Sequence, residues 1–183
     1  MGEQGKKVLC DMVIWLIGLS GSGKTTLGRE IASQWRAVSA NTVLLDGDEV
    51  REIFKHDRDV DSYSLEGRRQ NAERMTALCK MLDDQGINVV CCILSIFPEM
   101  RAENRSLFSD YFEIFMDAPI DALKQRDVKG LYAAAERGEM PNVVGLDIEF
   151  ERPVGSDIVI DSSSETADIR SLANDVLQKA GIR

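Results

Sequence analysis

The segment that most constrains this chain is Gly18-Leu19-Ser20-Gly21-Ser22-Gly23-Lys24-Thr25. Its spacing matches a known phosphate-binding pattern: Gly, four residues, Gly-Lys, and then Ser or Thr. The apolar run at residues 12–18 predicts a strand buried on both faces, and residues 25–37 carry apolar side chains at helical spacing. A strand, a glycine loop and a helix in this order predict a phosphate-binding loop at the carboxyl end of a strand.

Each residue type in this loop has a physical role in holding a polyphosphate. Glycines let the backbone curl so that successive N–H groups face one anion at a helix N-terminus, whose dipole favours negative charge. Lys24 supplies a positive charge for the β- and γ-phosphate oxygens, and the Thr25 hydroxyl is placed to bind Mg²⁺. We therefore expect ATP and Mg²⁺ as cofactors, with ATP held by Gly18, Ser20, Gly21, Ser22, Gly23, Lys24, Thr25 and Thr26.

The rest of the chain alternates between strand-like and helix-like segments. Further strands are expected at residues 42–45, 87–95, 111–116 and 158–160, and helices at 49–54, 68–85, 99–108, 120–126 and 166–179. This alternation predicts an α/β fold of the three-layer P-loop NTPase type, with a parallel central sheet and helices on both faces. The 183 residues suit a single P-loop kinase domain, expected at residues 12–183 after a flexible N-terminal extension of residues 1–11.

A polar stretch at residues 129–147 is too long for a simple connection between two elements. Gly130, Gly138 and Gly145 interrupt it, which is typical of a segment that moves. We expect this stretch to be a lid that closes over both substrates and excludes water, because water in an open site would take the phosphoryl group.

Charge and the rarer residues exclude several classes of function. The formal net charge of −9 argues against a nucleic-acid binder, because phosphate backbones require clustered Lys and Arg. No apolar run approaches the ~20 residues of a membrane span. Four cysteines without metal-ligand spacing indicate core thiols in a reducing, cytoplasmic compartment, and the single histidine, His56, is expected in a polar loop. The Asn-Lys-x-Asp motif of switch GTPases is missing, so the size and the lid favour a small-molecule kinase.

Two carboxylates follow the second predicted strand, in Asp46-Gly47-Asp48. A carboxylate at a strand end beside the phosphate loop can accept the proton of an acceptor hydroxyl or hold a metal-bound water. Asp48 is also placed to cap the helix that follows.

A group of cationic and amide side chains completes the predicted acceptor side. Arg68 and Asn71 lie three residues apart on one helical face, and Arg74 continues that face. Together with Arg51, such a face can hold an acidic nucleotide by charge-assisted hydrogen bonds. The alternative is a solvated basic face on an acidic protein.

Four segments of the chain match one known family in register. They are Leu45-Asp46-Gly47-Asp48-Glu49-Val50-Arg51; Ser64 with Arg68, Asn71 and Arg74; Arg126-Asp127-Val128-Lys129-Gly130-Leu131-Tyr132; and Gly145-Leu146-Asp147 with Glu151 and Pro153. These segments resemble adenylylsulfate kinases, which phosphorylate the ribose 3′-hydroxyl of adenosine 5′-phosphosulfate. The resemblance runs from about Met12 to the end of the chain, and its most specific part is the heptapeptide that begins at Arg126.

The resemblance implies roles for individual residues. It makes Asp46 the catalytic base, assisted by Lys24 and Arg51, with Thr25 and Asp46 as the metal ligands. Arg126 and Pro153 lie where the family encloses the adenine of ATP. The small-molecule nucleotide acceptor is expected against Asp48, Arg51, Tyr63, Arg68, Asn71, Ser95, Ile96, Lys129, Asn142 and Val143. The family also implies a homodimer.

The chain departs from the family pattern in the acceptor pocket. Family members hold the acceptor's adenine between two phenylalanines, whereas this chain has Tyr63 and Val143 at those places. The loss of one aromatic partner removes about 1–3 kcal/mol of base stacking. Leu94-Ser95-Ile96 likewise replaces an Ile-Ser-Pro segment.

Three hypotheses for the function follow. Adenosine 5′-phosphosulfate comes first as acceptor because it is the substrate of the larger group. A related group acts in capsule phosphoramidate synthesis and phosphorylates cytidine diphosphoramidate, whose smaller pyrimidine fits between Tyr63 and Val143 without a second ring. The third hypothesis, a non-catalytic nucleotide-binding regulator, does not explain why Asp46, Lys24 and Arg51 are all present.

Overall fold

The computed structural model describes residues 11–55, 61–127, 130–164 and 168–182. Its centre is a five-stranded parallel sheet with the strand order β2-β3-β1-β4-β5. The strands are β1 (Val13–Ile17), β2 (Thr42–Asp46), β3 (Asn88–Cys92), β4 (Tyr111–Asp117) and β5 (Ile158–Asp161). The predicted α/β class and parallel sheet are confirmed.

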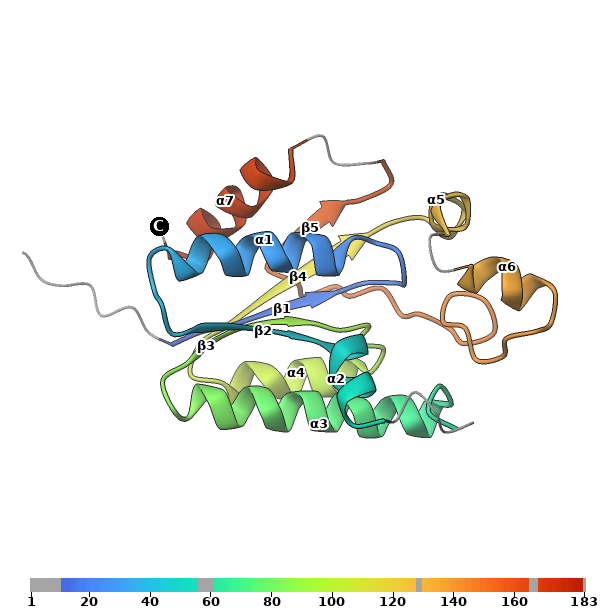
Figure 1. Cartoon of the computed structure of the whole chain (residues 1–183), viewed down its shortest axis with the longest axis horizontal. Coiled ribbons are helices and arrows are strands. Elements are labelled where there is room, and N and C mark those ends of the chain that lie inside the picture. Colours follow the sequence, from blue (N-terminus) through green and yellow to red (C-terminus); the bar gives the residue numbers. More distant parts are fainter. Residues whose placement is uncertain (1–10, 56–60, 128–129, 165–167, 183) are drawn as a thin grey trace, which may run out of the picture.

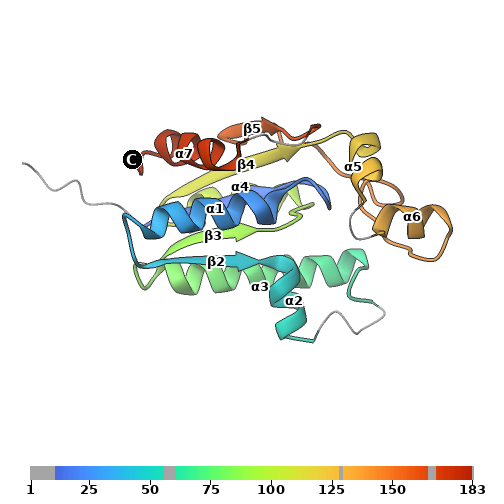
Figure 2. The same cartoon turned by 45° about the horizontal axis from the view of Figure 1, so that its top comes forward.

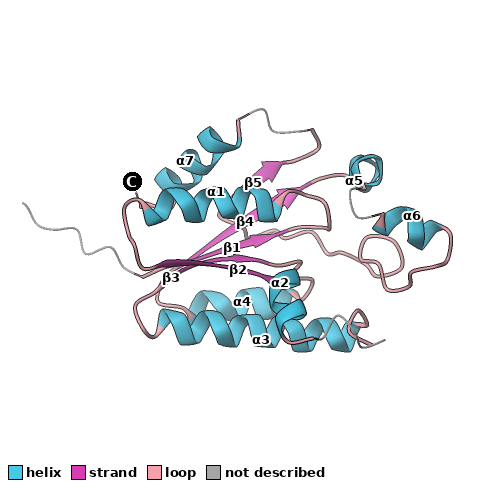
Figure 3. Cartoon of the chain, in the orientation of Figure 1, coloured by secondary structure: helices cyan, strands magenta, loops and turns pink. Residues whose placement is uncertain are grey.

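Helices cover both faces of the sheet (Figures 1 and 3). One face carries α1 (Lys24–Arg36) and α7 (Ile169–Lys179), and the other carries α3 (Leu65–Asp83) and α4 (Pro98–Leu107). Alternate residues of β1 serve the two layers: Ile14 packs with the α1 side and Trp15 with the α3 side. All five residues of β1 are therefore buried, as expected for a central parallel strand.

Three short helices gather beyond the carboxyl ends of the strands (Figure 2). These are α2 (Gly47–Ile53), which follows β2 without a loop, α5 (Ile120–Arg126) after β4, and α6 (Leu131–Glu136). This end of a parallel sheet is where α/β proteins bind their ligands.

The helix starts differ from the predictions because of the caps. The α3 helix begins at Leu65, three residues before the predicted start, because Ser64 Oγ accepts a hydrogen bond from Gly67 N at 3.1 Å. The prediction that Asp48 caps α2 is wrong. Asp46 is the cap, and its Oδ1 accepts from Asp48 N at 2.9 Å.

The α6 segment, defined as residues 130–147, contains one helix that was not predicted. A left-handed residue, Gly130 with φ 66°, begins α6, and Asp127 accepts hydrogen bonds from the first backbone N–H groups of the helix. Whether this segment moves as a lid stays a prediction.

Some expectations fall outside the described ranges. Residues 1–10, His56 and Lys129 lie there, so the flexible extension and the role of Lys129 stay predictions. Within the described ranges, every helix is too short or too polar to cross a membrane.

Gly28 in α1 lies directly against the end of β3. A Cβ at Gly28 would lie 2.3 Å from Cys92 Sγ, so alanine must displace a buried atom. We expect Gly28→Ala to lower the free energy of unfolding by about 1–3 kcal/mol through overpacking, partly offset by the higher helix propensity of alanine. Chemical denaturation measures this loss. Adding Cys92→Ala should recover part of it, and strictly additive losses in the double variant would contradict the contact.

Candidate active site

The loop between β1 and α1 has the backbone of a phosphate cradle. Gly21 and Gly23 adopt φ values of 78° and 92°, which side chains with a Cβ disfavour. Gly18 has no room for a side chain, since a Cβ there would lie 2.6 Å from the carbonyl oxygen of Met116. No side chain caps the first turn of α1, and no acidic residue lies in it. The positive end of the helix dipole therefore faces the loop without a compensating protein carboxylate in that turn.

Two side chains in the loop are arranged for a phosphate ligand. Lys24 Nζ donates to the carbonyl oxygens of Gly18 and Leu19, at 2.8 Å each, and so lies across the loop. Ser22 is 1% exposed, and its Oγ has no hydrogen-bond partner in the described part of the chain. A buried hydroxyl without a partner is costly, so Ser22 fits a site that a phosphate oxygen completes.

A hydroxyl and a carboxylate meet beside this loop. Thr25 Oγ1 donates to Asp46 Oδ2 at 2.6 Å, and Asp46 is 6% exposed. Hard oxygen ligands of this kind suit Mg²⁺, which is usually bound by one or two protein groups together with phosphates and water. No group of three or more His, Cys, Asp or Glu side chains that could hold a metal by itself occurs among the described residues. The pair therefore fits Mg²⁺ brought by a nucleotide.

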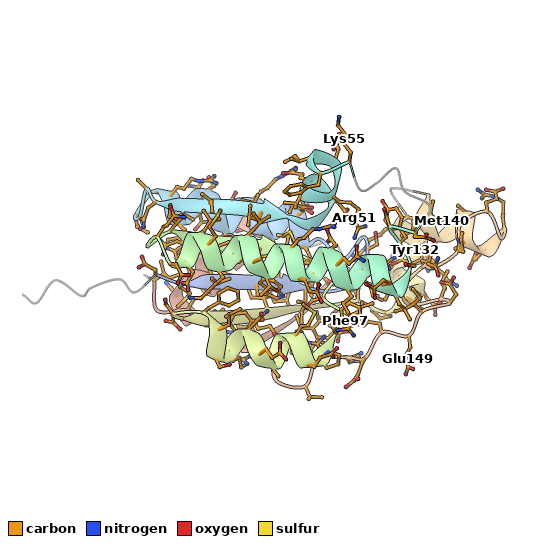
Figure 4. The ribbon with its side chains drawn as sticks, turned by 90° about the horizontal axis from the view of Figure 1, so that it is seen from below. Arg51, Lys55, Phe97, Tyr132, Met140 and Glu149 are labelled. Atoms are coloured by element: carbon orange, nitrogen blue, oxygen red, sulfur yellow. The ribbon has the colours of Figure 1, made fainter. Side chains whose placement is uncertain are left out.

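Two arginines flank the ring of Tyr63. Arg51 is 7% exposed, and its guanidinium lies 4.7 Å from the ring centroid, while that of Arg68 lies 5.7 Å away. Burial, together with the nearby charge of Arg51, lowers the pKa of Arg68 to about 10. Two like charges held this close are unfavourable on their own, and an anion between them would compensate. Figure 4 shows Arg51 pointing from α2 toward the end of the molecule that carries Tyr132 and Met140.

The three predicted acceptor residues of α3 do not all face the same space. Asn71 and Arg74 line a cavity of about 330 Å³ together with Arg51. The other lining residues are Asp61, Ser62, Ser64, Glu66, Gly67 and Gln70. Arg68 points elsewhere: its Nε donates to the carbonyl oxygen of Tyr63 at 2.9 Å and its Nη2 to that of Asn142 at 2.7 Å.

The other predicted acceptor residues occupy two settings. Val143 is 2% exposed and belongs to an apolar cluster, named here the α6 cluster, of Leu19, Leu123, Tyr132, Val143 and Val144. Ile96 packs against this cluster, so both apolar side chains serve packing in this conformation. Ser95 is in a polar setting: its Oγ accepts a hydrogen bond from Trp15 Nε1 at 3.3 Å. Its backbone φ is 55°, in the left-handed region.

Of the two residues expected around the adenine of ATP, Pro153 is buried and Arg126 is half-buried at the end of α5. Arg126 Nη2 is enclosed without a hydrogen-bond partner among the described residues. Such a donor fits an acceptor atom on a ligand.

One contact at the site was missed from the sequence. Tyr132 Oη donates to the carbonyl oxygen of Ser20 in the phosphate loop at 2.9 Å. Tyr132 ends the heptapeptide that gave the strongest resemblance, and this was the available signal.

The phosphate loop and the Thr25–Asp46 pair are the features expected of a P-loop kinase. This chain belongs to the adenylylsulfate kinase family: the family model described as "Adenylylsulphate kinase" matches residues 10–161. It is thus a phosphotransferase of an ATP-using family, as the resemblance implied.

Individual relatives differ in the acceptor that they use. The chain is 42% identical over 151 residues to a cytidine diphosphoramidate kinase of Campylobacter jejuni, covering 82% of this chain and 86% of that protein. It is 36% identical to a probable adenylyl-sulfate kinase of Pseudomonas aeruginosa, covering 84% and 71%. The structure of the Mycobacterium tuberculosis APS kinase CysC in complex with AMPPNP and APS superposes with a TM-score of 0.81 at 29% identity, covering 93% and 98%.

The paired hydrogen bonds of Arg68 generate a testable prediction. Lysine keeps the charge but cannot make both bonds in the same geometry. We expect Arg68→Lys to raise the KM of the nucleotide acceptor about tenfold, the value of one charge-assisted hydrogen bond, with a much smaller effect on the KM of ATP. Steady-state kinetics measures both constants. Arg69→Lys, an exposed neighbour paired with Glu99 at 3.0 Å, is the control, and an equal rise in this variant would contradict the assignment.

Proposed function

We propose that this chain transfers the γ-phosphoryl group of ATP to the ribose 3′-hydroxyl of a nucleotide whose 5′ end carries a diphosphate-like anion, and that this acceptor is cytidine diphosphoramidate. The observation that carries the choice of acceptor is the second position of the base pocket. Val143 replaces an aromatic residue there, and its side chain is buried in the α6 cluster. The 42% identity to a kinase of that acceptor supports the same choice.

Base size is the physical argument for a cytidine acceptor. A purine gains most from stacking on two aromatic faces, and each lost face costs about 1–3 kcal/mol. Only Tyr63, 42% exposed, offers an accessible ring at the positions where the family stacks the base. A pyrimidine has less surface to cover and loses less when one face is aliphatic.

The described side chains suit each part of the transfer. Asp46 accepts the proton of the attacking ribose hydroxyl while that oxygen forms its bond to the γ-phosphorus and the bond to the β-phosphate oxygen breaks, leaving ADP. Lys24 moves from the carbonyl oxygens that it now contacts to the β- and γ-phosphate oxygens. Thr25 and Asp46 would hold Mg²⁺, which would supply further neutralisation of phosphate charge. Arg51 and Arg68 hold the acceptor's anionic groups.

Adenosine 5′-phosphosulfate, the acceptor that the sequence analysis places first, is the second candidate here. Relatives at 36% and 32% identity are adenylyl-sulfate kinases, and the Mycobacterium tuberculosis structure superposes over nearly the whole chain. The large share of the fold held in common supports this acceptor, whereas the composition of the base pocket does not.

Direct assay of the two acceptors tests the choice. Purified protein with Mg·ATP is given each acceptor separately, and ADP release is measured by a coupled reaction. We expect kcat/KM to be at least tenfold higher for cytidine diphosphoramidate, as the loss of one purine stacking face predicts. A higher kcat/KM for adenosine 5′-phosphosulfate would overturn the choice, and ADP release that neither compound stimulates would contradict both.

The role of Asp46 is tested by Asp46→Asn, which keeps an oxygen for the α2 cap but cannot take a proton. We expect kcat to fall about 100-fold or more, as is usual when a general base is lost, while the Kd of AMPPNP changes much less. Glu49→Gln, an exposed carboxylate of α2 paired with Arg29, is the matched control and should keep the wild-type kcat. Unchanged transfer by Asp46→Asn would show that another group takes the proton.

A further inference from the structure

Tyr132 links two parts of the chain that lie 112 residues apart. It is the second residue of α6, is 2% exposed, and donates from its hydroxyl to the carbonyl oxygen of Ser20 at 2.9 Å. Neither the phosphate pattern nor the acceptor residues account for this contact. It is the hydrogen bond by which a side chain of the α6 segment reaches the backbone of the phosphate loop.

The accepting carbonyl belongs to a peptide group that matters for phosphate binding. The carbonyl of Ser20 shares its peptide plane with the N–H of Gly21, so a hydrogen bond to the oxygen fixes where that N–H points and polarises it. Gly21 and Gly23, both with positive φ, have no side chains to hold this part of the loop, while Lys24 Nζ binds the carbonyl oxygens of Gly18 and Leu19 at the start of the loop. An external anchor therefore has a large effect on the loop's conformation.

Tyr132 is itself held firmly enough to act as that anchor. Its backbone N donates to Asp127 Oδ1 at 3.1 Å, and the N of Ala133 donates to Oδ2 at 2.9 Å. Its ring belongs to the α6 cluster, which also contains Leu19 of the phosphate loop. Burial, with a smaller contribution from the charge of Asp127, raises the pKa of Tyr132 to about 12, so the hydroxyl keeps its proton and remains a donor at neutral pH.

The same segment is attached to the acceptor side at its other end. Arg68 Nη2 donates to the carbonyl oxygen of Asn142 at 2.7 Å, and Asn142 has a left-handed φ of 63°. The α6 segment thus bridges the loop expected to hold ATP and the helix expected to hold the acceptor. Figure 4 shows Tyr132 and Met140 of this segment at the same end of the molecule as Arg51.

We propose that Tyr132 is a positioning residue: its hydroxyl couples the α6 segment to the phosphate loop and holds the Ser20–Gly21 peptide in the orientation that binds the nucleotide's phosphates. It contacts neither substrate through this bond. The proposal rests on the proposed function only in taking ATP as the donor, and it does not depend on which acceptor is used.

The test is Tyr132→Phe, which removes one oxygen and keeps the ring in the α6 cluster. We measure the Kd of AMPPNP with Mg²⁺ by calorimetry and, at saturating AMPPNP, the rate of tryptic cleavage at the exposed Arg137 of the segment. We expect Kd to rise about fivefold, the value of one neutral hydrogen bond, and the protection of Arg137 by AMPPNP to be reduced. The KM of the acceptor should change less than twofold.

Tyr111→Phe is the matched control. Tyr111 is also buried, at 8% exposed, and its hydroxyl donates to Glu113 Oε2 at 2.8 Å in β4. Loss of this hydrogen bond should lower thermal stability and leave the Kd of AMPPNP unchanged. A purely structural role for Tyr132 predicts the same pattern in both variants, and a wild-type Kd in Tyr132→Phe overturns the proposal.

A second variant decides the question if Tyr132→Phe does not fold. Asp127→Asn leaves the Tyr132 hydroxyl in place but weakens the side-chain acceptor for the backbone N–H groups at the start of α6. We expect a rise in the Kd of AMPPNP of about two- to fivefold, because the anchored tyrosine becomes less well placed. An unchanged Kd in this variant would then overturn the proposal. Failure of acceptor turnover alone would count against the proposed function and not against this role of Tyr132.

Discussion

The hydrogen bond between Thr25 and Asp46 is the interaction on which the site depends, because it joins the start of α1 to the end of β2, a strand that is not a neighbour of β1. Thr25 follows the loop after β1, and Asp46 ends β2, with β3 lying between these strands. The strand register aligns the carboxyl ends of β1 and β2, because Cys92 of β3 pairs with Leu16 of β1 on one side and with Asp46 of β2 on the other. Its Sγ also donates to the carbonyl oxygen of Lys24 at 3.4 Å. The parallel sheet therefore sets the distance between the phosphate loop and the carboxylate of Asp46, the proposed base.

The proposed acceptor side contains two positive charges, Arg51 and Arg68, that lie unfavourably close to each other when no ligand is bound. The chain is acidic overall, with a net charge of −9, yet it places the guanidinium groups of Arg51 and Arg68 within 4.7 and 5.7 Å of the centroid of one tyrosine ring. Burial, and after it the charge of Arg51, lowers the pKa of Arg68, and an anionic ligand would relieve the repulsion between the two arginines. Under the proposed function, binding energy from the acceptor's anionic groups would be available to align its ribose hydroxyl.

The sequence predicts the fold around the glycine loop well because the signals there are local. Gly18 to Thr25 carry a fixed spacing, and the runs on either side show the periods of a strand and a helix, so the fold and the place of Asp46 can be inferred without tertiary information. The α6 helix could not be inferred from the sequence. Leu131–Glu136 is one short helix in a polar stretch, and its start depends on hydrogen bonds to Asp127. The cap of α2 was assigned to Asp48 instead of Asp46, because two similar carboxylates stand two residues apart. Contacts such as Tyr132 with Ser20, or the burial of Val143, depend on packing between distant segments and leave no local pattern.

The most direct test of the account is a crystal structure with Mg²⁺ and AMPPNP bound. In that structure we expect Lys24 Nζ to leave the carbonyl oxygens of Gly18 and Leu19 and to contact the β- and γ-phosphates, and we expect the metal beside Thr25 with Asp46 facing it. A structure in which Lys24 keeps both carbonyl contacts while the nucleotide binds elsewhere, or in which Asp46 faces away from the γ-phosphate, would contradict the account.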